Sequence, residues 1–218
     1  MLFRSWSGLV NFYDINERVF PGPLIVFESF WILLLDGSLL KHTVASLYRV
    51  TVGFYLAAII GIPLGIFIGR TEFARNFLNP VIQFLKPISP LAWIPLAMLW
   101  FGIGDKPAIF LIFLACFFPL IVSTAIAVAS INKVYFQVAS NFNFSCFEKL
   151  LKITVPAIIP DLVTALRLTV SIAWLVVVAA EMIAVQSGLG YLILDSRNAL
   201  RMDYVMVGMI AIGIIGLI

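Results

Sequence analysis

Residues Val50 to Gly69 read VTVGFYLAAIIGIPLGIFIG, an uncharged run bounded by Arg49 and Arg70. About 20 residues of helix cross the hydrocarbon core of a bilayer, so this run predicts a membrane span. Its last three glycines recur every fourth residue, on one helix face, at Gly61, Gly65 and Gly69. Small residues at this spacing let a second helix approach closely, so we predict tight helix packing here.

The composition of the whole chain agrees with a lipid environment. Of its 218 residues, 62% are hydrophobic and only 11% are charged. The mean hydropathy is +1.10. A soluble domain carries about 25% charged residues, so a soluble enzyme, a nucleic-acid-binding domain and a disordered chain are excluded. The net charge of +3 comes from basic residues scattered between apolar runs, which are typical topology signals rather than a nucleic-acid patch.

Four further apolar runs predict spans, at Pro87–Gly104, Pro107–Asn132, about Leu162–Ile183 and Tyr204–Ile218. The run from Leu24 to Leu35 is too short to cross, so we predict a short interfacial helix there. All spans must be helical, because an open sheet cannot satisfy its backbone hydrogen bonds in lipid. The expected fold is therefore a single all-α polytopic membrane domain over residues 1–218, with five visible spans.

The distribution of Lys and Arg predicts the orientation. The 70–86 and 133–167 segments lie on the same side and carry seven basic residues: Arg70, Arg75, Lys86, Lys133, Lys149, Lys152 and Arg167. The opposite side carries three basic residues, Lys106, Arg197 and Arg201, when the first 49 residues are left out of the count. Because basic loops stay in the cytoplasm, we expect the 133–160 loop to be cytoplasmic.

Two features inside the spans suggest a translocation path. Three prolines of the stretch KPISPLAWIP, residues 86–95, remove backbone donors and disfavour helix in the residue before each. This irregular stretch either lines a path, with Ser89 and Trp93 facing it, or is a kinked span satisfied by its neighbours. Glu181 is the only acid well inside a span, so it is either functional or hydrated at the membrane edge. No pattern predicts a catalytic, metal-binding or cofactor-binding residue.

The longest polar loop, Val134 to Pro160, reads VYFQVASNFNFSCFEKLLKITVPAIIP. We expect one or two helical turns at Val138–Asn141, ended by Asn143, because Asn tolerates the left-handed conformation. A second helix is expected over Cys146–Thr154, after which two prolines bend the chain back to the bilayer. A short cytoplasmic helix between two spans can serve as a docking site through which another protein moves the spans. The alternative is a solvated linker.

This loop resembles the signature of the permease subunits of binding-protein-dependent ABC importers. That signature has Glu-Ala-Ala, a Gly four residues later and then Leu-Pro. Its counterparts here are Gln137-Val138-Ala139, Asn143 and Val155-Pro156. The stretches LKPISPLAWIPLAMLWFGIGDKPAIFLIFLACFFPLIVSTAIAV (85–128) and VVAAEMIAVQSGLGYLILDSRN (177–198) resemble the nitrate, sulfonate, taurine and bicarbonate class. The resemblance covers roughly Pro21 to Ile218.

The resemblance implies a multi-pass permease in the bacterial inner membrane, normally of six spans, so the first span is expected to be absent and the last truncated. It implies a homodimer with two ATP-binding cassette ATPase subunits and a substrate-binding protein outside. A short helix around Ala139 to Ser145 would dock in each ATPase, with coupling residues Gln137, Ala139, Asn143, Phe144 and Ser145.

A small oxyanion is the expected cargo, with hydroxyl donors along the path from Ser89, Ser123, Thr124 and Ser171. The alternative is a self-contained secondary transporter or channel, which predicts inverted repeats and paired intramembrane ionisable groups.

Overall fold

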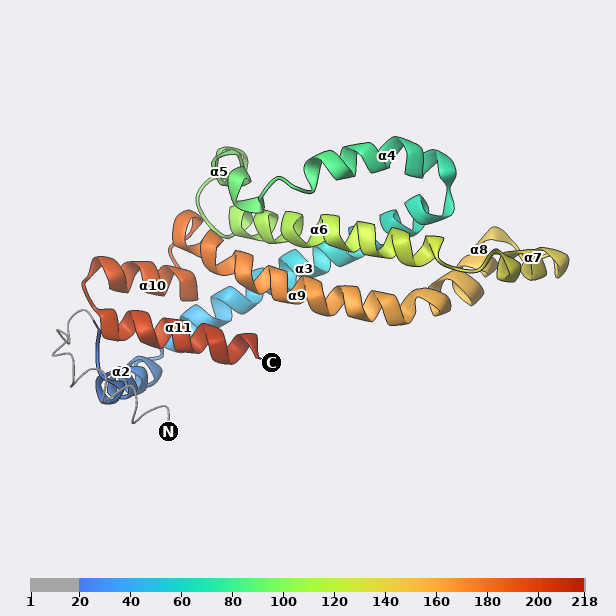
Figure 1. Cartoon of the computed structure of the whole chain (residues 1–218). Helices are drawn as coiled ribbons and strands as arrows, with labels where there is room; N and C mark the ends of the chain where they lie inside the picture. The colour runs from blue at the N-terminus through green and yellow to red at the C-terminus, as the bar shows by residue number, and fades with distance from the viewer. Residues whose placement is uncertain (1–19, 218) are drawn as a thin grey trace. The chain divides into compact units, whose positions relative to one another are not determined.

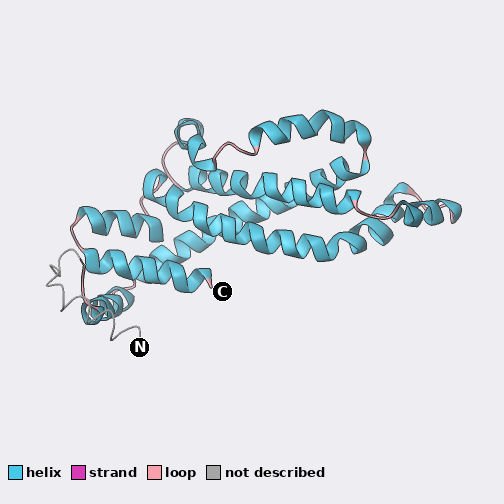
Figure 2. Ribbon diagram, viewed as in Figure 1, coloured by secondary structure: helices cyan, strands magenta, loops and turns pink. Residues whose placement is uncertain are grey.

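The computed structural model describes residues 20–217, and the described chain consists of helices and loops without a strand (Figures 1 and 2). The α-helices are α2 Pro23–Leu35, α3 Ser38–Arg70, α4 Glu72–Leu85, α5 Ile94–Phe101, α6 Asp105–Ala129, α7 Lys133–Asn141, α8 Cys146–Lys149, α9 Val155–Ala184, α10 Leu189–Asn198 and α11 Met202–Gly216. A 3-10 helix, η1 (Pro90–Trp93), precedes α5, and a π-helix, η2 (Leu150–Thr154), joins α8 to α9. The predicted all-α class is confirmed, as is the short helix before the first span.

The number of spans differs from the prediction of five. Three helices in the described part are long and apolar enough to cross a membrane: α3, α6 and the continuous helix Cys146–Ala184. A fourth is possible if α4 and the η1–α5 unit count as one span, although they are bent by 84°. The last predicted span, α11, has only 15 residues.

The predicted span Pro87–Gly104 is not one continuous helix, as both the kinked-span and the irregular-stretch alternatives expected. Only the eight residues of α5 and the short η1 are helical within it. The chain leaves the helical conformation between α4 and η1, next to Pro87 and Pro90. A proline lacks the backbone donor and its ring disfavours helix in the preceding residue, which explains the break at this point.

The described chain divides into two compact units, and α3, α6 and α9 contribute to both. Unit 1 covers residues 20–51, 94–109 and 174–217. In it, α11 packs against α10 and α2. The shared core is apolar and consists of Val26, Leu33, Leu39, Leu189, Leu192, Val207 and Ala211.

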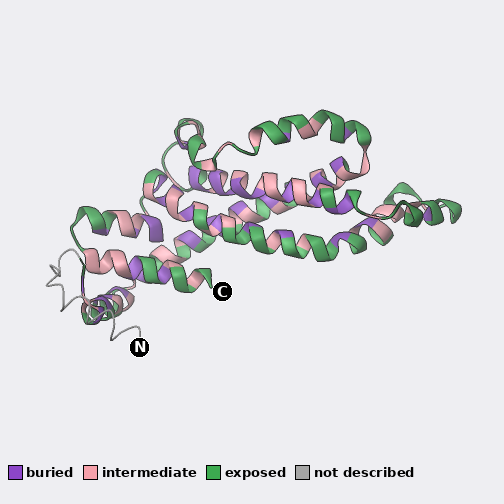
Figure 3. Ribbon diagram, viewed as in Figure 1, coloured by how far each residue is buried: buried purple, intermediate pink, exposed green. Residues whose placement is uncertain are grey.

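Unit 2 covers residues 52–93 and 110–173, and its centre is the contact between α3 and α6. A Cβ on Gly65 would lie 2.6 Å from Thr124 Cβ, and one on Gly69 would lie 2.7 Å from Val128 Cβ. Both distances are too short for any side chain larger than hydrogen. The predicted role of these glycines in helix packing is therefore confirmed, and Figure 3 shows buried residues along both helices.

The chain after the polar loop also differs from the prediction. The fourth span was expected to begin at Leu162, after Pro156 and Pro160 had bent the chain. Instead α9 begins at Val155, directly after η2, and contains Pro160 in its interior. Pro156 is the second residue of α9, yet it lies within the continuous helix Cys146–Ala184, directly after the π-helical turn η2.

Candidate functional site

The polar segment Lys133–Thr154 projects from unit 2 as a compact pair of short helices, α7 and α8 (Figure 1). Asn132 starts α7, because its side chain accepts a hydrogen bond from the Val134 amide at 3.0 Å. This contact satisfies one of the amides that every helix start leaves unpaired. Of the predicted coupling residues in α7, Gln137 is exposed and Ala139 is buried.

Asn143 ends α7 in the left-handed conformation, with φ of 56°. The Phe144 amide donates to the Ala139 carbonyl at 2.9 Å, and the Asn143 amide donates to the Ser140 carbonyl at 3.0 Å. This pair of bonds is the Schellman motif, which satisfies the last carbonyls of a helix. The predicted helix stop at Asn143 is confirmed, and Asn is one of the few residues with a side chain that visits this conformation readily.

Ser145 opens the next helix with a reciprocal pair of hydrogen bonds. Its Oγ accepts from the Glu148 amide at 3.2 Å, while its own amide donates to Glu148 Oε2 at 2.9 Å. This capping box fixes the start of α8 at Cys146, with four residues between it and the end of α7. The helix implied by the resemblance over Ala139–Ser145 is therefore placed differently, since α7 ends at Asn141 and residues 142–145 form the turn.

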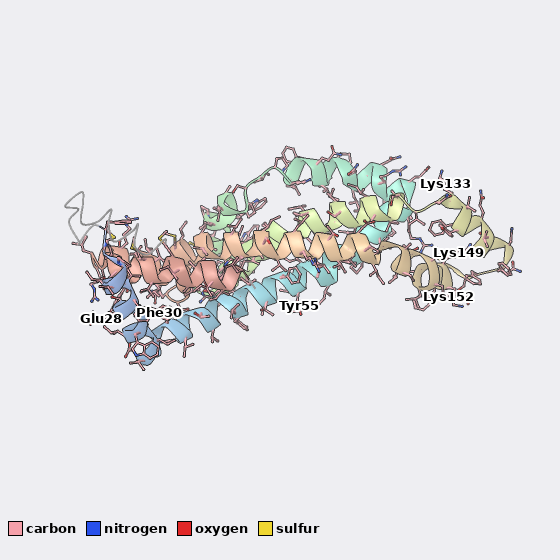
Figure 4. The ribbon with its side chains drawn as sticks, turned by 60° about the horizontal axis from the view of Figure 1, so that its bottom comes forward. Glu28, Phe30, Tyr55, Lys133, Lys149 and Lys152 are labelled. Atoms are coloured by element: carbon pink, nitrogen blue, oxygen red, sulfur yellow. The ribbon has the colours of Figure 1, made fainter. Side chains whose placement is uncertain are left out.

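Two lysines tie the second helical stretch to the first. Lys149 Nζ donates to Ser140 Oγ at 2.9 Å, and Lys152 Nζ lies 4.9 Å from the centre of the Phe144 ring. Figure 4 labels both lysines beside the turn. Contacts that join α7, the turn and the π-helix hold the segment in one conformation.

Apolar side chains remain exposed on α7 and its C-cap. Val134, Val138 and Phe142 are 54%, 48% and 72% exposed, and they lie four residues apart on one face. Figure 3 shows the exposed surface of this segment in green. The sequence analysis did not identify this face, although the spacing of four residues was visible in it.

The second polar site lies in unit 1 around Glu181, whose side chain is fully buried. Its carboxylate accepts hydrogen bonds from Arg49 Nη1 at 2.6 Å, Ser46 Oγ at 2.8 Å and the Gly190 amide at 3.0 Å. Arg49 is itself only 1% exposed. The alternative of a carboxylate simply hydrated at the membrane edge is therefore wrong.

Arg49 joins three parts of unit 1 at once. Its Nε donates to Asp105 Oδ1 at 2.8 Å, its Nη1 donates to the Ser187 carbonyl at 2.8 Å, and Nη2 donates to Ser187 Oγ. The Gly188 amide donates to His42 Nδ1 at 3.0 Å. Gly188 has φ of 106°, and a Cβ there would overlap the Glu181 carboxylate.

The sequence analysis assigned Arg49 only to the boundary of a span. A usable signal was present, since His42, Ser46 and Arg49 are spaced by four and three residues and therefore share one face of α3. Their polar atoms meet the α9–α10 connection, which no local pattern in the chain predicts.

The other predicted path residues are spread over several elements of unit 2. Ser89 lies exposed between α4 and η1, and Trp93 is half-buried at the end of η1. Ser123 is half-buried in α6, and Ser171 is exposed in α9 with its hydroxyl bonded to the Arg167 carbonyl. No hydrogen bond in the described part of the chain joins any two of the six predicted path residues.

Thr124 differs from the others in that its hydroxyl is buried and has no hydrogen-bond partner within residues 20–217. A buried hydroxyl without a partner costs free energy, so this position is unfavourable for the side chain. Its methyl side packs close to Gly65, as described above.

The comparison with known families decides the class of this protein. Residues 61–218 match the family described as binding-protein-dependent transport system inner membrane component. The chain belongs to this family. Its members are permease subunits of ABC importers, so the chain is a multi-pass transporter component and not an enzyme.

Individual relatives agree with the assignment. A Methanocaldococcus jannaschii protein described as an ABC transporter permease is 40% identical over 96% of this chain and 79% of its own length. The taurine transport system permease protein TauC of Escherichia coli is 33% identical over 99% of this chain and 80% of its own length. The nitrate import permease protein NrtB of Leptolyngbya laminosa is 36% identical over 100% of this chain and 80% of its own length. The predicted family and permease function are confirmed, and the alternative of a self-contained transporter is set aside.

Proposed function

We propose that the 133–154 segment is the surface through which an ATPase subunit drives this permease. The observation that supports it most is the exposed apolar face of Val134, Val138 and Phe142 on a helix fixed at both ends. This segment lies directly between α6 and α9, two of the long apolar helices. Motion imposed on α7 is therefore passed to both helices through short, hydrogen-bonded connections.

The chain itself carries out no covalent step in this proposal. ATP binding on the partner subunits favours one of two packings of the permease helices, and hydrolysis restores the other. A ligand shifts such an equilibrium only by its differential affinity for the two states. The coupling segment supplies this difference for the ATPase, and Gln137, Asn143, Phe144 and Ser145 are the residues that shape it.

A homodimer of this chain is part of the proposal, together with an external substrate-binding protein. Two ATPase subunits close on each other when they bind ATP, and a two-fold permease offers each of them an identical docking segment. Cross-linking of the full chain in membranes should therefore trap a dimer.

The proposed cargo is a small oxyanion. Relatives are named for taurine and for nitrate, both of which carry anionic oxygens. Neutral donors suit such a cargo, since a full positive charge on the path would hold it too tightly for release. Thr124 is the strongest of the proposed path donors because its buried hydroxyl has no partner among the described residues. Ser89, Trp93, Ser123 and Ser171 remain proposed neutral members of the path, and Glu181, whose charge is paired with Arg49, is its one proposed acidic member.

The test of coupling uses a matched pair of variants at Asn143. Asn143→Val forces a β-branched residue to φ of 56°, whereas Asn143→Gly allows the same backbone. The strain costs about 1–2 kcal/mol, which lowers the equilibrium ratio of correct to incorrect turn by about 5–30-fold. In vesicles with the ATPase and binding protein, Asn143→Val should have lower uptake than the unmodified chain while Asn143→Gly retains it. Equal uptake by the two variants would contradict the coupling role.

The cargo is tested separately with the unmodified chain. Uptake of labelled nitrate, taurine, an alkanesulfonate and bicarbonate is measured in the same vesicles, with and without ATP. We expect ATP-dependent, saturable uptake of one of these anions. If none of them is transported while ATP hydrolysis responds to the binding protein, the oxyanion proposal is wrong and the coupling proposal stands.

A further inference from the structure

A cavity of about 340 Å³ lies in unit 2, where α3 ends, α4 begins and α6 passes into α7. Four charged side chains line it: Arg70, Glu72, Arg75 and Lys133. Its apolar wall includes Val128 and Phe136. Close packing of α3 on α6 at Gly69 closes one side of the cavity.

Two of the three cations in this cavity have no carboxylate partner. Arg75 Nη2 lies 3.8 Å from Glu72 Oε1, so these two charges offset each other. Arg70 has only a weak contact with Cys146 Sγ at 3.9 Å, and Lys133 has no hydrogen bond or ion pair within residues 20–217. The cavity therefore carries two positive charges without a carboxylate partner, which favour an anionic ligand.

The helix that begins at this cavity has an aromatic stripe on its exposed side. Phe73, Phe77 and Phe84 of α4 are 82%, 68% and 74% exposed, and the rings of Phe73 and Phe77 stack at 6.2 Å. Ala74 and Ile82 are buried on the other side of the helix. In a membrane protein, an exposed apolar stripe that starts beside unpaired cations fits a molecule with an anionic head and apolar chains.

We propose that this cavity binds the phosphate of an anionic phospholipid, whose acyl chains lie along the Phe73–Phe77–Phe84 stripe. Arg70 presents a planar fork of donors that matches phosphate oxygens, and Lys133 adds a second point charge from the start of α7. Basic pockets between membrane helices on the cytoplasmic side are suited to such head groups. This inference depends on the charges and the membrane location, and not on the proposed coupling.

The full chain in detergent is titrated with dioleoylphosphatidylglycerol and, separately, dioleoylphosphatidylcholine, and bound lipid is counted by native mass spectrometry. We expect one phosphatidylglycerol to bind more tightly than phosphatidylcholine. Each cation near an anionic lipid contributes roughly fivefold in affinity, so the double variant Arg70→Gln/Lys133→Gln should lose about 25-fold. The matched control Lys41→Gln/Arg197→Gln also removes one lysine and one arginine, both exposed and outside the cavity, and should stay within about threefold of the unmodified chain.

Several outcomes would overturn the proposal. Equal binding of the two lipids, or equal losses in the double variant and its control, would mean non-specific attraction. Displacement of the lipid by millimolar glycerol phosphate would mean that the site takes a free anion. A change from dimer to monomer in the double variant would mean that a second copy of the chain occupies the surface.

The single variant Lys133→Gln tests the same site in case the double variant does not fold. Lys133 is exposed, so Lys133→Gln should leave the elution volume of the protein unchanged and still lower phosphatidylglycerol affinity about fivefold. Lys133→Arg retains the charge and should bind as the unmodified chain does. Unchanged affinity in Lys133→Gln would contradict the assignment.

Discussion

Glu181 and Glu148 are two carboxylates with similar partners and opposite surroundings. Glu181 accepts from Arg49, Ser46 and a backbone amide in a site without solvent exposure. Glu148 accepts from Lys152 Nζ at 3.1 Å and from the Ser145 amide at 2.9 Å, and its side chain is 42% exposed. The two carboxylates therefore make the same kinds of hydrogen bond, but Glu181 is shielded from water and Glu148 is partly exposed to it.

This difference in burial distinguishes a region that stabilises the fold, around Glu181, from an exposed region that can contact a partner, the 133–154 segment. A buried charge that loses its partner has no water to replace it, so the cluster around Glu181 is costly to disturb. The 133–154 segment is solvated, and its hydrogen bonds fix a shape while its apolar face stays exposed. We therefore expect substitutions in the first region to reduce stability and those in the second to reduce coupling.

The largest expected effect comes from Glu181→Ala, which leaves Arg49 buried without its main partner. Removal of one member of a buried ion pair costs about 3–5 kcal/mol. Thermal unfolding of the purified variant in detergent should show this loss, or the variant should fail to accumulate in the membrane. The matched control is Glu148→Ala, for which we expect a nearly unchanged unfolding temperature. Equal destabilisation by the two substitutions would remove the distinction between the regions.

A smaller effect is expected from the glycines that let α3 contact α6. Gly65→Ala places a Cβ 2.6 Å from Thr124 Cβ, so the helices must separate, at a cost of about 1–3 kcal/mol. Gly213→Ala is the control, because no atom lies within 4 Å of the added Cβ. Alanine is about 1 kcal/mol better than glycine in a helix, so this control should be neutral or more stable. A loss of stability in Gly213→Ala equal to that in Gly65→Ala would contradict the packing argument.

The smallest effect on overall stability is expected from Ser145→Ala, which removes the cap of α8. Loss of such a cap costs about 1 kcal/mol and acts only on the local helix start. Hydrogen exchange should become faster within residues 142–150 while α3 and α6 keep their protection. Ser145→Asp restores a capping oxygen and should return exchange to the original rate. Faster exchange throughout the chain would mean that the segment is part of the folding core.

The sequence predicted those features that depend on neighbouring residues. The apolar run before Arg70 predicted a long helix, the glycine spacing predicted its packing face, and Asn143 predicted the end of α7. Each of these follows from local hydropathy or backbone preference, which a linear sequence contains. The family assignment also followed from contiguous stretches of residues.

Features that depend on distant contacts were not predictable in this way. The pairing of Arg49 with Glu181 joins residues 132 positions apart, and nothing local in either helix specifies it. The prolines of residues 86–95 predicted an irregular or kinked stretch, but the 84° angle between α4 and the η1–α5 unit could not be predicted, because hydropathy does not record how the chain is directed. The continuous helix through Pro156 and Pro160 was missed because proline removes a backbone donor and usually bends or ends a helix, whereas here both prolines lie within one.

The central claim is that the exposed face of α7 meets the ATPase subunit. A photo-cross-linking amino acid at Val138, in the full chain assembled with its ATPase in membranes, tests this directly. The same amino acid at Leu24, which is 83% exposed on α2, is the control. We predict an adduct with the ATPase at Val138, altered in yield by ATP, and none at Leu24. An absence of the Val138 adduct, or equal adducts at both positions, would contradict the account.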